Sequence, residues 1–279
     1  MRLTGLHPNN PVAVMAAYGA LRLLPGARIR WSGPHPELEF GGDITTHLAE
    51  QLPERLAAPE NALLDDVIDC PGLVGSIPDE WLMSYAGQCP PQKGGGGRKA
   101  RMQQAGWTPT DLLLLAGRHL FVANARKIME RLAEQDVRAK LDEALVGPWR
   151  YEDAGLQAWG WDAATRIDAA SAVDEVTNAP KLGVFGAYWL AWESLPLWSM
   201  INGHTVGMSR SGWTYPTCPE WLGLEGLRSL ILAEDRLGPR ELRTLGVTRW
   251  HSPRLRLSDY GSVLGWAQPE KREPQAKPK

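Results

Sequence analysis

The first part of the chain alternates short β-prone runs with stretches whose apolar residues recur at helical spacing. RLTGL near the N-terminus is predicted to be a short strand, and residues 11–24 form the first helical pattern. Asn10 and Pro11 suit the start of that helix, as an N-cap residue and a proline at the first helical position. The apolar positions that define the pattern are Val14, Tyr18, Leu21 and Leu24.

A β-hairpin is predicted next, followed by a second helix. RIRW at 28–31 and ELEF at 37–40 are β-prone runs on either side of SGPHP, whose glycine and prolines favour a turn. Asp43 can cap a helix that continues to about Leu52, and Pro53 is expected to end or kink it.

The middle of the chain predicts one long helical region. Residues 69–91 are rich in turn signals and lead into four consecutive glycines, after which residues 112–146 carry apolar side chains three or four positions apart. Thr108 or Thr110 can cap this region, and its length predicts a single break. LLLLAG at 112–117 is expected to be a buried helix segment, because it is far too short to span a bilayer.

The last part of the chain combines helices with β-prone pairs. Helices are predicted within residues 183–198, ending near Pro196, and over residues 224–237. Residues 203–216 predict a hairpin in which HTV and WTY flank a Gly-Ser-Arg turn. VTRWHS and RLRLSDY are expected to pair as two basic strands that close the fold.

These elements predict an α+β fold with an N-terminal strand–helix–hairpin unit, a central helical region and a C-terminal lobe of mixed helix and β-hairpin. Two lobes are expected, at residues 1–105 and 106–265, followed by a disordered tail at 266–279. The chain has 279 residues, of which 43% are hydrophobic and 22% charged, so it can bury a substantial core.

Cysteine usage and hydropathy favour a cytoplasmic protein. Cys70, Cys89 and Cys218 are too few and too widely spaced for a disulfide framework. The apolar run at 12–24 resembles the core of a secretory signal, but Arg22 interrupts it. No stretch approaches the roughly 20 apolar residues of a membrane span, so no membrane partner is expected.

The net charge of −2 conceals a strong segregation of charge along the chain. Residues 93–131 carry a net charge of +6 and residues 236–256 a net charge of +5, whereas residues 1–92 and 132–235 carry −6 and −8. Two basic blocks in an otherwise acidic chain suit a partner with a polyanionic backbone. A solvated surface face is the alternative interpretation of the same pattern.

Cations flank the four glycines in QKGGGGRKARMQ, at residues 92–103. A P-loop is excluded because no lysine is followed by serine or threonine, and the glycine spacing does not fit a dinucleotide fingerprint. Glycines let backbone amides approach a phosphate closely, and they equally suit an inert hinge. The cations on both sides favour contact with a nucleic-acid backbone.

Further candidates extend this basic surface. Gln103 is attractive because an amide can pair bidentately with adenine. Arg254 and Arg256 alternate with leucine, which puts both on one strand face; that face either binds phosphate or pairs with acidic segments of the same chain. The predicted nucleic-acid-binding residues are Lys93, Gly94, Gly95, Gly96, Gly97, Arg98, Lys99, Arg101, Gln103, Arg118, Arg126, Lys127, Arg254 and Arg256.

Signals for catalysis, metals and cofactors are weak, so none is expected. The histidines show neither a His-Asp pair nor metal-ligand spacing; they are His7, His35, His47, His119, His204 and His251. Asp65-Asp66 and Asp174-Glu175 are adjacent carboxylates without a partner motif.

Eight of the 13 tryptophans lie within residues 149–221. At helical spacing, as for Trp189 and Trp192, they are expected to fill a core. Trp159 and Trp161, with Arg166 close by, also form a candidate cluster for contact with nucleic-acid bases.

Several motifs, taken in order, resemble those of a known family. LTGLHPNNPVAVMAAYGALRLLP followed by RIRW resembles the opening of CRISPR-associated effector-complex proteins of type I-G systems, formerly I-U. AWGWDAATRIDA, GAYWLAWESLPLW and WTYPTCPEWLGLEGLRSLI are similar to later motifs of that family. None of these motifs is catalytic, and the resemblance rests on their order along the chain.

The resemblance implies a large-subunit-like protein of a crRNA-guided surveillance complex (Cascade), which recognises a protospacer-adjacent motif and helps to open the duplex in antiviral defence. The partners implied are crRNA, target double-stranded DNA, other CRISPR effector subunits and a helicase-nuclease recruited in trans. The expected function is non-catalytic binding of target DNA. Two alternatives stay open: a metal-dependent enzyme acting on nucleotides or nucleic-acid ends, and a purely structural accessory subunit.

Overall fold

The computed structural model of the protein describes residues 1–64, 75–88, 91, 102–114, 121–153, 159–165, 182–233, 236–258 and 261–270. These residues form an α+β fold, as the sequence predicts. The helices are α1 (Pro11–Leu23), α2 (Ile44–Ala57), α3 (Glu60–Leu63), α4 (Asp79–Tyr85), α6 (Phe121–Ala133), α7 (Val137–Val146), α8 (Phe185–Glu193), α9 (Leu224–Ala233) and α10 (Pro239–Thr244), with 3-10 turns at Ala163–Thr165 and Leu195–Leu197.

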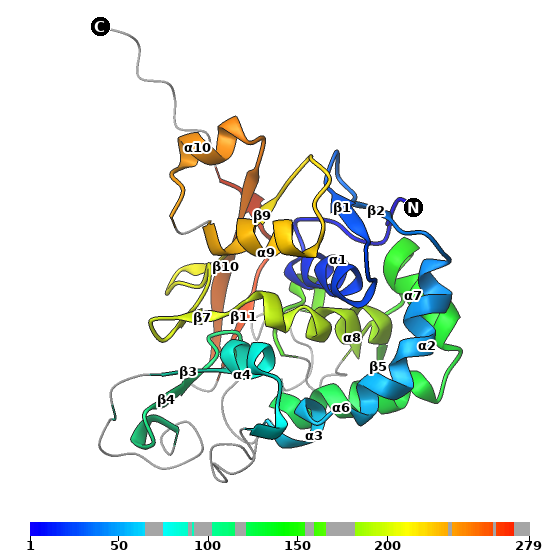
Figure 1. The fold of residues 1–279 in the computed structure, drawn as a ribbon, viewed down its shortest axis with the longest axis horizontal. Helices are drawn as coiled ribbons and strands as arrows, with labels where there is room; N and C mark the ends of the chain where they lie inside the picture. The colour runs from blue at the N-terminus through cyan, green and yellow to red at the C-terminus, as the bar shows by residue number, and fades with distance from the viewer. Residues whose placement is uncertain are drawn as a thin grey trace, which may run out of the picture.

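Short antiparallel pairs of strands accompany one larger antiparallel sheet. The strands are β1 (Arg28–Arg30), β2 (Glu37–Glu39), β3 (Ala86–Gln88), β4 (Trp107–Pro109), β5 (Glu152–Asp153), β6 (Leu182–Gly183), β7 (Met200–Ile201), β8 (His204–Thr205), β9 (Gly212–Thr217), β10 (Thr248–Ser258), β11 (Gly261–Leu264) and β12 (Gln268–Pro269). Figure 1 shows α1 and α8 in the middle of the molecule, between the outer helices α2, α6 and α7 and the strands β9, β10 and β11.

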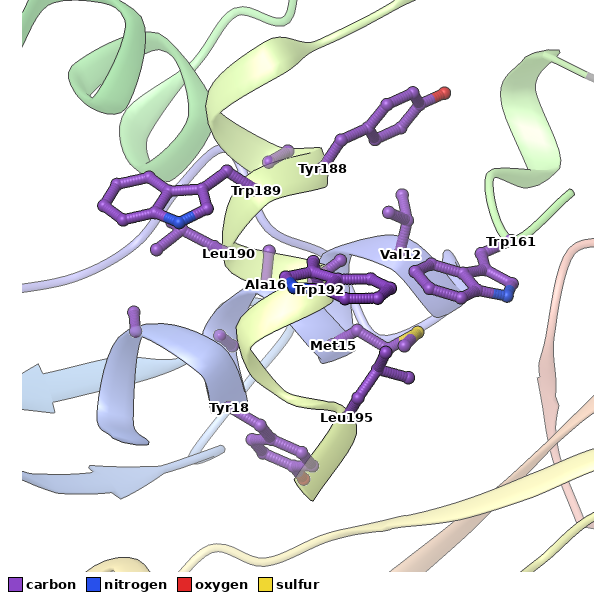
Figure 2. Close-up of a cluster of buried hydrophobic side chains, with 14 of the residues drawn as sticks. Val12, Met15, Ala16, Tyr18, Trp161, Tyr188, Trp189, Leu190, Trp192 and Leu195 are labelled. Carbon is purple, nitrogen blue, oxygen red and sulfur yellow. The ribbon is translucent and has the colours of Figure 1, made fainter. Parts of the chain in front are cut away.

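The α1–α8 pair forms the centre of the core. A helix that is apolar on every side belongs in a protein interior, and every residue of α8 is buried. α1 is buried along its whole length except at Arg22. The two backbones meet at Gly19, where a Cβ atom would lie 1.7 Å from the carbonyl oxygen of Leu190. Figure 2 shows side chains of α1 and α8 packed together, with the ring of Trp161 entering the same cluster.

β1 and β2 form the predicted hairpin, with one apolar face and one charged face. Ile29 and Leu38 face each other across the strands, and both are buried. The alternation of side chains then leaves the charged residues on the other face, where opposite charges pair across the strands. These ion pairs are Arg28–Glu39 and Arg30–Glu37.

α2 begins at the predicted residue. The Asp43 carboxylate accepts a hydrogen bond from the Thr46 amide at 2.7 Å, which satisfies one of the free donors of the first turn. Pro53 does not end the helix, which continues to Ala57.

α1 also begins where the sequence predicts, but its N-cap differs. Asn10 makes no side-chain hydrogen bond to the first turn of the helix. Its side-chain amide instead donates to Asp162 at 2.8 Å, far away in the sequence. A buried tertiary contact therefore replaces the expected local cap.

Within residues 121–146 the long helical region is broken once, between α6 and α7, as predicted, but residues 112–114, where it was expected to begin, are not helical. Leu112 and Leu114 are buried in irregular chain rather than in a helix. Thr110 does not cap a helix, because it follows β4 and its hydroxyl shares a hydrogen bond with the Thr205 hydroxyl at 3.0 Å. Residues 115–120 lie outside the described part of the chain.

β10 pairs with β9, β11 and β12 and is the longest strand of the main sheet. The two basic runs that the sequence predicts to pair with each other both belong to this one strand. The predicted hairpin at 203–216 is partly wrong, because β8 pairs with β7, while Met208 bridges Trp213. The Tyr18 and Tyr215 hydroxyls tie the sheet to the α1 region by donating to the carbonyls of Pro216 and Pro8, at 2.5 and 2.8 Å.

The start of the predicted tail is ordered. Gln268 pairs with His251, and the Ala267 amide donates to the Asn9 carbonyl at 2.7 Å. These contacts explain why residues 266–270 do not behave as a tail, whereas residues 271–279 lie outside the described part. The division into lobes at 105/106 stays a prediction, and one buried cluster draws side chains from both sides of it.

Candidate nucleic-acid interface

α6 presents two of the predicted cations to solvent. Its apolar face is buried, whereas Arg126 and Lys127 are exposed. This division follows helical periodicity, because α6 packs against α8, α2 and α3 on its apolar side. The buried residues of α6 are Phe121, Val122, Ala125, Ile128, Met129 and Leu132.

The two α6 cations differ in their pairing. Arg126 Nε lies 3.0 Å from Glu130 Oε1, and the two side chains are 54% and 45% exposed. An exposed pair of this spacing on a helix contributes about 0.3–0.5 kcal/mol, so a phosphate can replace the carboxylate at little energetic cost. Lys127 forms no ion pair with a carboxylate among the described residues.

β10 carries the second pair of predicted cations. Arg254 and Arg256 are both exposed, on either side of the half-buried Leu255. The alternation places both arginines on one strand face. Arg249 of the same strand pairs with Glu270 at 3.4 Å, whereas Arg254 has no ion pair in the part of the chain that the structure describes. Among the described carboxylates, Glu270 therefore neutralises Arg249, and none neutralises Arg254.

Of the rest of the predicted set, the structure describes Gln103 alone. Gln103 lies in a single helical turn and is half-buried. α6 belongs to the helical side of the fold and β10 to the sheet side (Figure 1). The predicted residues that lie outside the described part are Lys93, Gly94, Gly95, Gly96, Gly97, Arg98, Lys99, Arg101 and Arg118.

The tryptophans of the candidate base-contact cluster are buried. Trp159 and Trp161 are 3% and 1% exposed, and their rings stack at 4.5 Å. Their indole nitrogens donate to the carbonyls of Phe121 and Leu112, at 2.9 and 2.8 Å. The prediction that these two rings contact bases is therefore wrong, because no base can reach them, whereas the core role predicted for Trp189 and Trp192 is confirmed.

A group of three arginines and three glutamates, the Glu193 cluster, joins six helices. Glu193 is fully buried and accepts hydrogen bonds from Arg22 at 3.1 Å and from Arg55 at 3.0 Å. The two guanidinium groups also lie over the ring of Trp81, at 5.3 and 5.5 Å from its centre. The members of the cluster are Arg22, Arg55, Glu60, Glu80, Glu193 and Arg228.

In the Glu193 cluster, burial and the neighbouring opposite charges act in opposite directions on the pKa values of Glu193 and Arg55. Burial raises the pKa of Glu193, while Arg55 and Arg22 work against that rise. Burial acts to lower the pKa of Arg55, yet Glu193 and Glu60 hold it above its ordinary value. Because the charges of Glu193, Arg22 and Arg55 satisfy one another within the core, we assign this cluster to the fold and not to a substrate.

Asp162 is the centre of a second buried polar group. One carboxylate oxygen accepts from the Asn10 side chain at 2.8 Å and from the Ala164 amide at 3.0 Å, and the other accepts from the Tyr188 hydroxyl at 3.2 Å. Burial raises the pKa of Asp162, against the effect of these donors. Burial also raises the pKa of Tyr151, with a further contribution from Asp162.

The described residues offer little to the alternative of a metal-dependent enzyme. Within them, no three His, Cys, Asp or Glu side chains come together in a way that could hold a metal ion. The carboxylate pairs Asp65-Asp66 and Asp174-Glu175 lie outside the described ranges.

An open groove of about 500 Å³ lies beside the N-terminus, β2 and the start of α2. Its lining includes three acidic residues, Glu37, Glu39 and Asp43, against two cationic groups, the Arg2 guanidinium and the ammonium group of Met1. Like charges repel, so this groove is unsuited to phosphate.

Sequence reasoning missed two exposed residues beside Arg254. Trp266 is 49% exposed, the only large aromatic side chain that is exposed in the described part. Arg210 is exposed as well, and its neighbour Ser211 accepts a hydrogen bond from the Arg254 amide at 2.8 Å. A single arginine and a single tryptophan carry no periodic signal, so only the strand pairing reveals that they are neighbours.

Similarity to known proteins does not identify the chain. No protein-family model matches it, and no curated protein is significantly similar to it in sequence. Among the helices of the described ranges, none combines the length and the apolar character needed to cross a bilayer. The function is therefore inferred from the side chains described above and from the motifs in the sequence.

Proposed function

We propose that this protein is a non-catalytic subunit of a crRNA-guided CRISPR type I surveillance complex in the cytoplasm, and that it binds target DNA near the adjacent motif. The proposal is supported by one observation above all: every predicted cation that the structure describes is exposed. These cations are Arg126, Lys127, Arg254 and Arg256. The ordered series of sequence motifs supplies the CRISPR assignment.

Exposure distinguishes these cations from the two most buried arginines of the Glu193 cluster, which pair with carboxylates of the fold. Arg22 and Arg55 are 12% and 17% exposed, and carboxylates within the core satisfy them. Such cations cannot release counterions from a nucleic acid, whereas Lys127 and Arg254, which form no ion pair with a described carboxylate, can do so. A chain of net charge −2 must bind a polyanion through such local cations.

The role in DNA binding is tested with two sets of substitutions. One variant replaces Lys93, Arg98, Lys99 and Arg101 by Gln, and the other carries Lys127→Gln with Arg254→Gln. Each is expected to bind a short labelled duplex more weakly, whatever its sequence. Removing one phosphate-binding cation should flatten the dependence of log K on log salt concentration by about one unit.

Arg138→Gln is the matched control, since Arg138 lies on α7, is 59% exposed and belongs to neither set. This variant should bind as the unaltered protein does. If both charge variants showed the same salt dependence as the unaltered protein, the substituted residues would not belong to the interface. Magnesium-dependent turnover of nucleotides or nucleic-acid ends by the purified chain would replace the proposal with the enzyme alternative.

The CRISPR assignment is tested separately, by purifying the full chain together with the products of its neighbouring genes. We expect crRNA and other effector subunits to co-purify with it. A purified assembly without crRNA would refute this part of the proposal.

A further inference from the structure

Trp266 is an aromatic ring that the fold does not use. Six tryptophans of the chain are less than 2% exposed, whereas 49% of Trp266 faces solvent between β11 and β12. No ring stacking or cation–π contact of Trp266 is found within the described ranges. An indole left open in this way suits stacking against a planar partner.

Backbone pairing brings two exposed arginines next to this ring. The Gly265 amide donates to the Pro253 carbonyl at 2.8 Å, so Trp266 and Arg254 each follow a residue of the same hydrogen-bonded pair. The Arg254 amide donates to the Ser211 carbonyl at 2.8 Å, which places Arg210 on the next segment. Arg254 pairs with Leu264, so Trp266 lies one strand away and two residues further along, while Arg210 lies one strand away on the other side and one residue along. At about 4.8 Å between strands and about 3.3 Å per residue, the Cα atoms of Trp266 and Arg210 lie about 8 and 6 Å from that of Arg254.

No described carboxylate compensates the positive charge of the surface formed by these residues, which is here called the Arg210–Arg254–Trp266 surface. Neither arginine forms an ion pair with a carboxylate in the described part of the chain. Two free guanidinium groups beside an open indole complement a ligand that alternates phosphates with planar bases. A duplex hides its base faces by stacking, whereas a single strand presents them.

We propose that the Arg210–Arg254–Trp266 surface is a docking site for single-stranded nucleic acid. One base stacks on the indole of Trp266, and the two arginines hold neighbouring phosphates. The inference deepens the proposed function and rests on it for the source of the ligand, because an opened target duplex supplies an unpaired strand.

The test uses the full chain and a labelled oligothymidylate of about 20 nucleotides, since stacking tolerates any base. Trp266→Ala should weaken binding by about 5- to 100-fold, the loss typical of one base stack. Trp266→Phe keeps an aromatic face and should stay within a few-fold of the unaltered protein. Met83→Ala removes another side chain that is 55% exposed, on α4, and should have no effect.

A double-mutant cycle shows whether the residues act as one site. Arg254→Gln alone should flatten the salt dependence by about one unit. Combined with Trp266→Ala, it should cost less affinity than the product of the two single effects, because both residues hold the same strand. Independent effects, or oligothymidylate binding by Trp266→Ala equal to that of the unaltered protein, would overturn the proposed docking site.

The outcomes separate this inference from the proposed function. The single-strand site alone is overturned if duplex binding depends on Lys127 and on the cations at positions 93–101, while oligothymidylate binding does not depend on Trp266. Oligothymidylate binding that depends on Trp266, without crRNA in the purified assembly, supports the site and overturns the CRISPR assignment alone.

Discussion

Glu193 gives the sharpest test of how the helical core is held together. Its carboxylate is fully buried and accepts hydrogen bonds from Arg22, Arg55 and the Trp189 indole, at 3.1, 3.0 and 3.2 Å. Glu193→Gln keeps the shape of the side chain but removes its charge. Arg22 and Arg55 then remain in the core with less negative charge to offset them.

Breaking a buried ion pair by neutralising one partner destabilises a protein by about 3–5 kcal/mol. In a chain of this size such a loss corresponds to a melting temperature lower by roughly 10 °C. Urea unfolding followed by tryptophan fluorescence measures the change, since Trp81 and Trp189 contact the cluster directly.

Glu225→Gln is the matched control, because the same change then falls on a surface pair. Glu225 is 78% exposed and lies 3.2 Å from Arg228 on the same helix. Its substitution should change the free energy of unfolding by less than about 0.5 kcal/mol. If Glu193→Gln were as mild as this control, the buried charges would not be stabilising one another and our account of the cluster would fail.

Two further predictions concern the core. Gly19→Ala places a Cβ atom 1.7 Å from the Leu190 carbonyl oxygen and should abolish cooperative thermal unfolding of soluble protein. The control variant Gly41→Ala, whose Cβ atom would have no atom within 4 Å, should melt like the unaltered chain. Equal melting of the two variants would contradict the close contact of α1 and α8. Asp162→Ala leaves the donors around it unpaired and should cost about 1–3 kcal/mol, whereas Asp162→Asn should be milder. Burial raises the pKa of Asp162, so the contribution of this side chain to stability is greatest below the ordinary pKa of 3.8 and falls as pH rises through the raised pKa. Urea unfolding at pH values from acidic to neutral should show this fall in the unaltered protein and not in Asp162→Asn. The same pH profile in both proteins would refute the raised pKa of Asp162.

Local signals in the sequence predicted the parts of the fold that local chemistry decides. The Asp43 cap, the β1–β2 hairpin and the break between α6 and α7 each depend on residues that are close together in the chain. The same holds for the burial of Trp189 and Trp192, whose helical spacing marks a core helix.

Tertiary contacts decided the features that sequence reasoning got wrong. Asn and Thr are residue types that commonly cap helices, but the side chains of Asn10 and Thr110 form hydrogen bonds with Asp162 and Thr205 instead. The two basic runs merge into β10, and Pro253 fits there because it lies opposite Gly212 and uses only its carbonyl, which accepts from Gly265. Such partners lie dozens of residues away and leave no trace in a local pattern.

The candidate interface was predictable only as a set of charges. The basic blocks pointed to Lys127 and Arg254, because charge segregation is visible in the sequence. They could not show that Arg249 pairs with Glu270 while Arg254 pairs with none of the described carboxylates, or that Trp266 lies one strand away from Arg254.

The most direct test of the central claim is the salt dependence of duplex DNA binding by the unaltered full chain. Two phosphate contacts, the number that the exposed cations of α6 or of β10 alone supply, correspond to binding about 10-fold weaker at about 200 mM salt than at about 50 mM. We predict a decrease at least that large. No binding at the lower concentration, or an affinity that salt does not change, would contradict the claim that this protein binds nucleic acid through these cations.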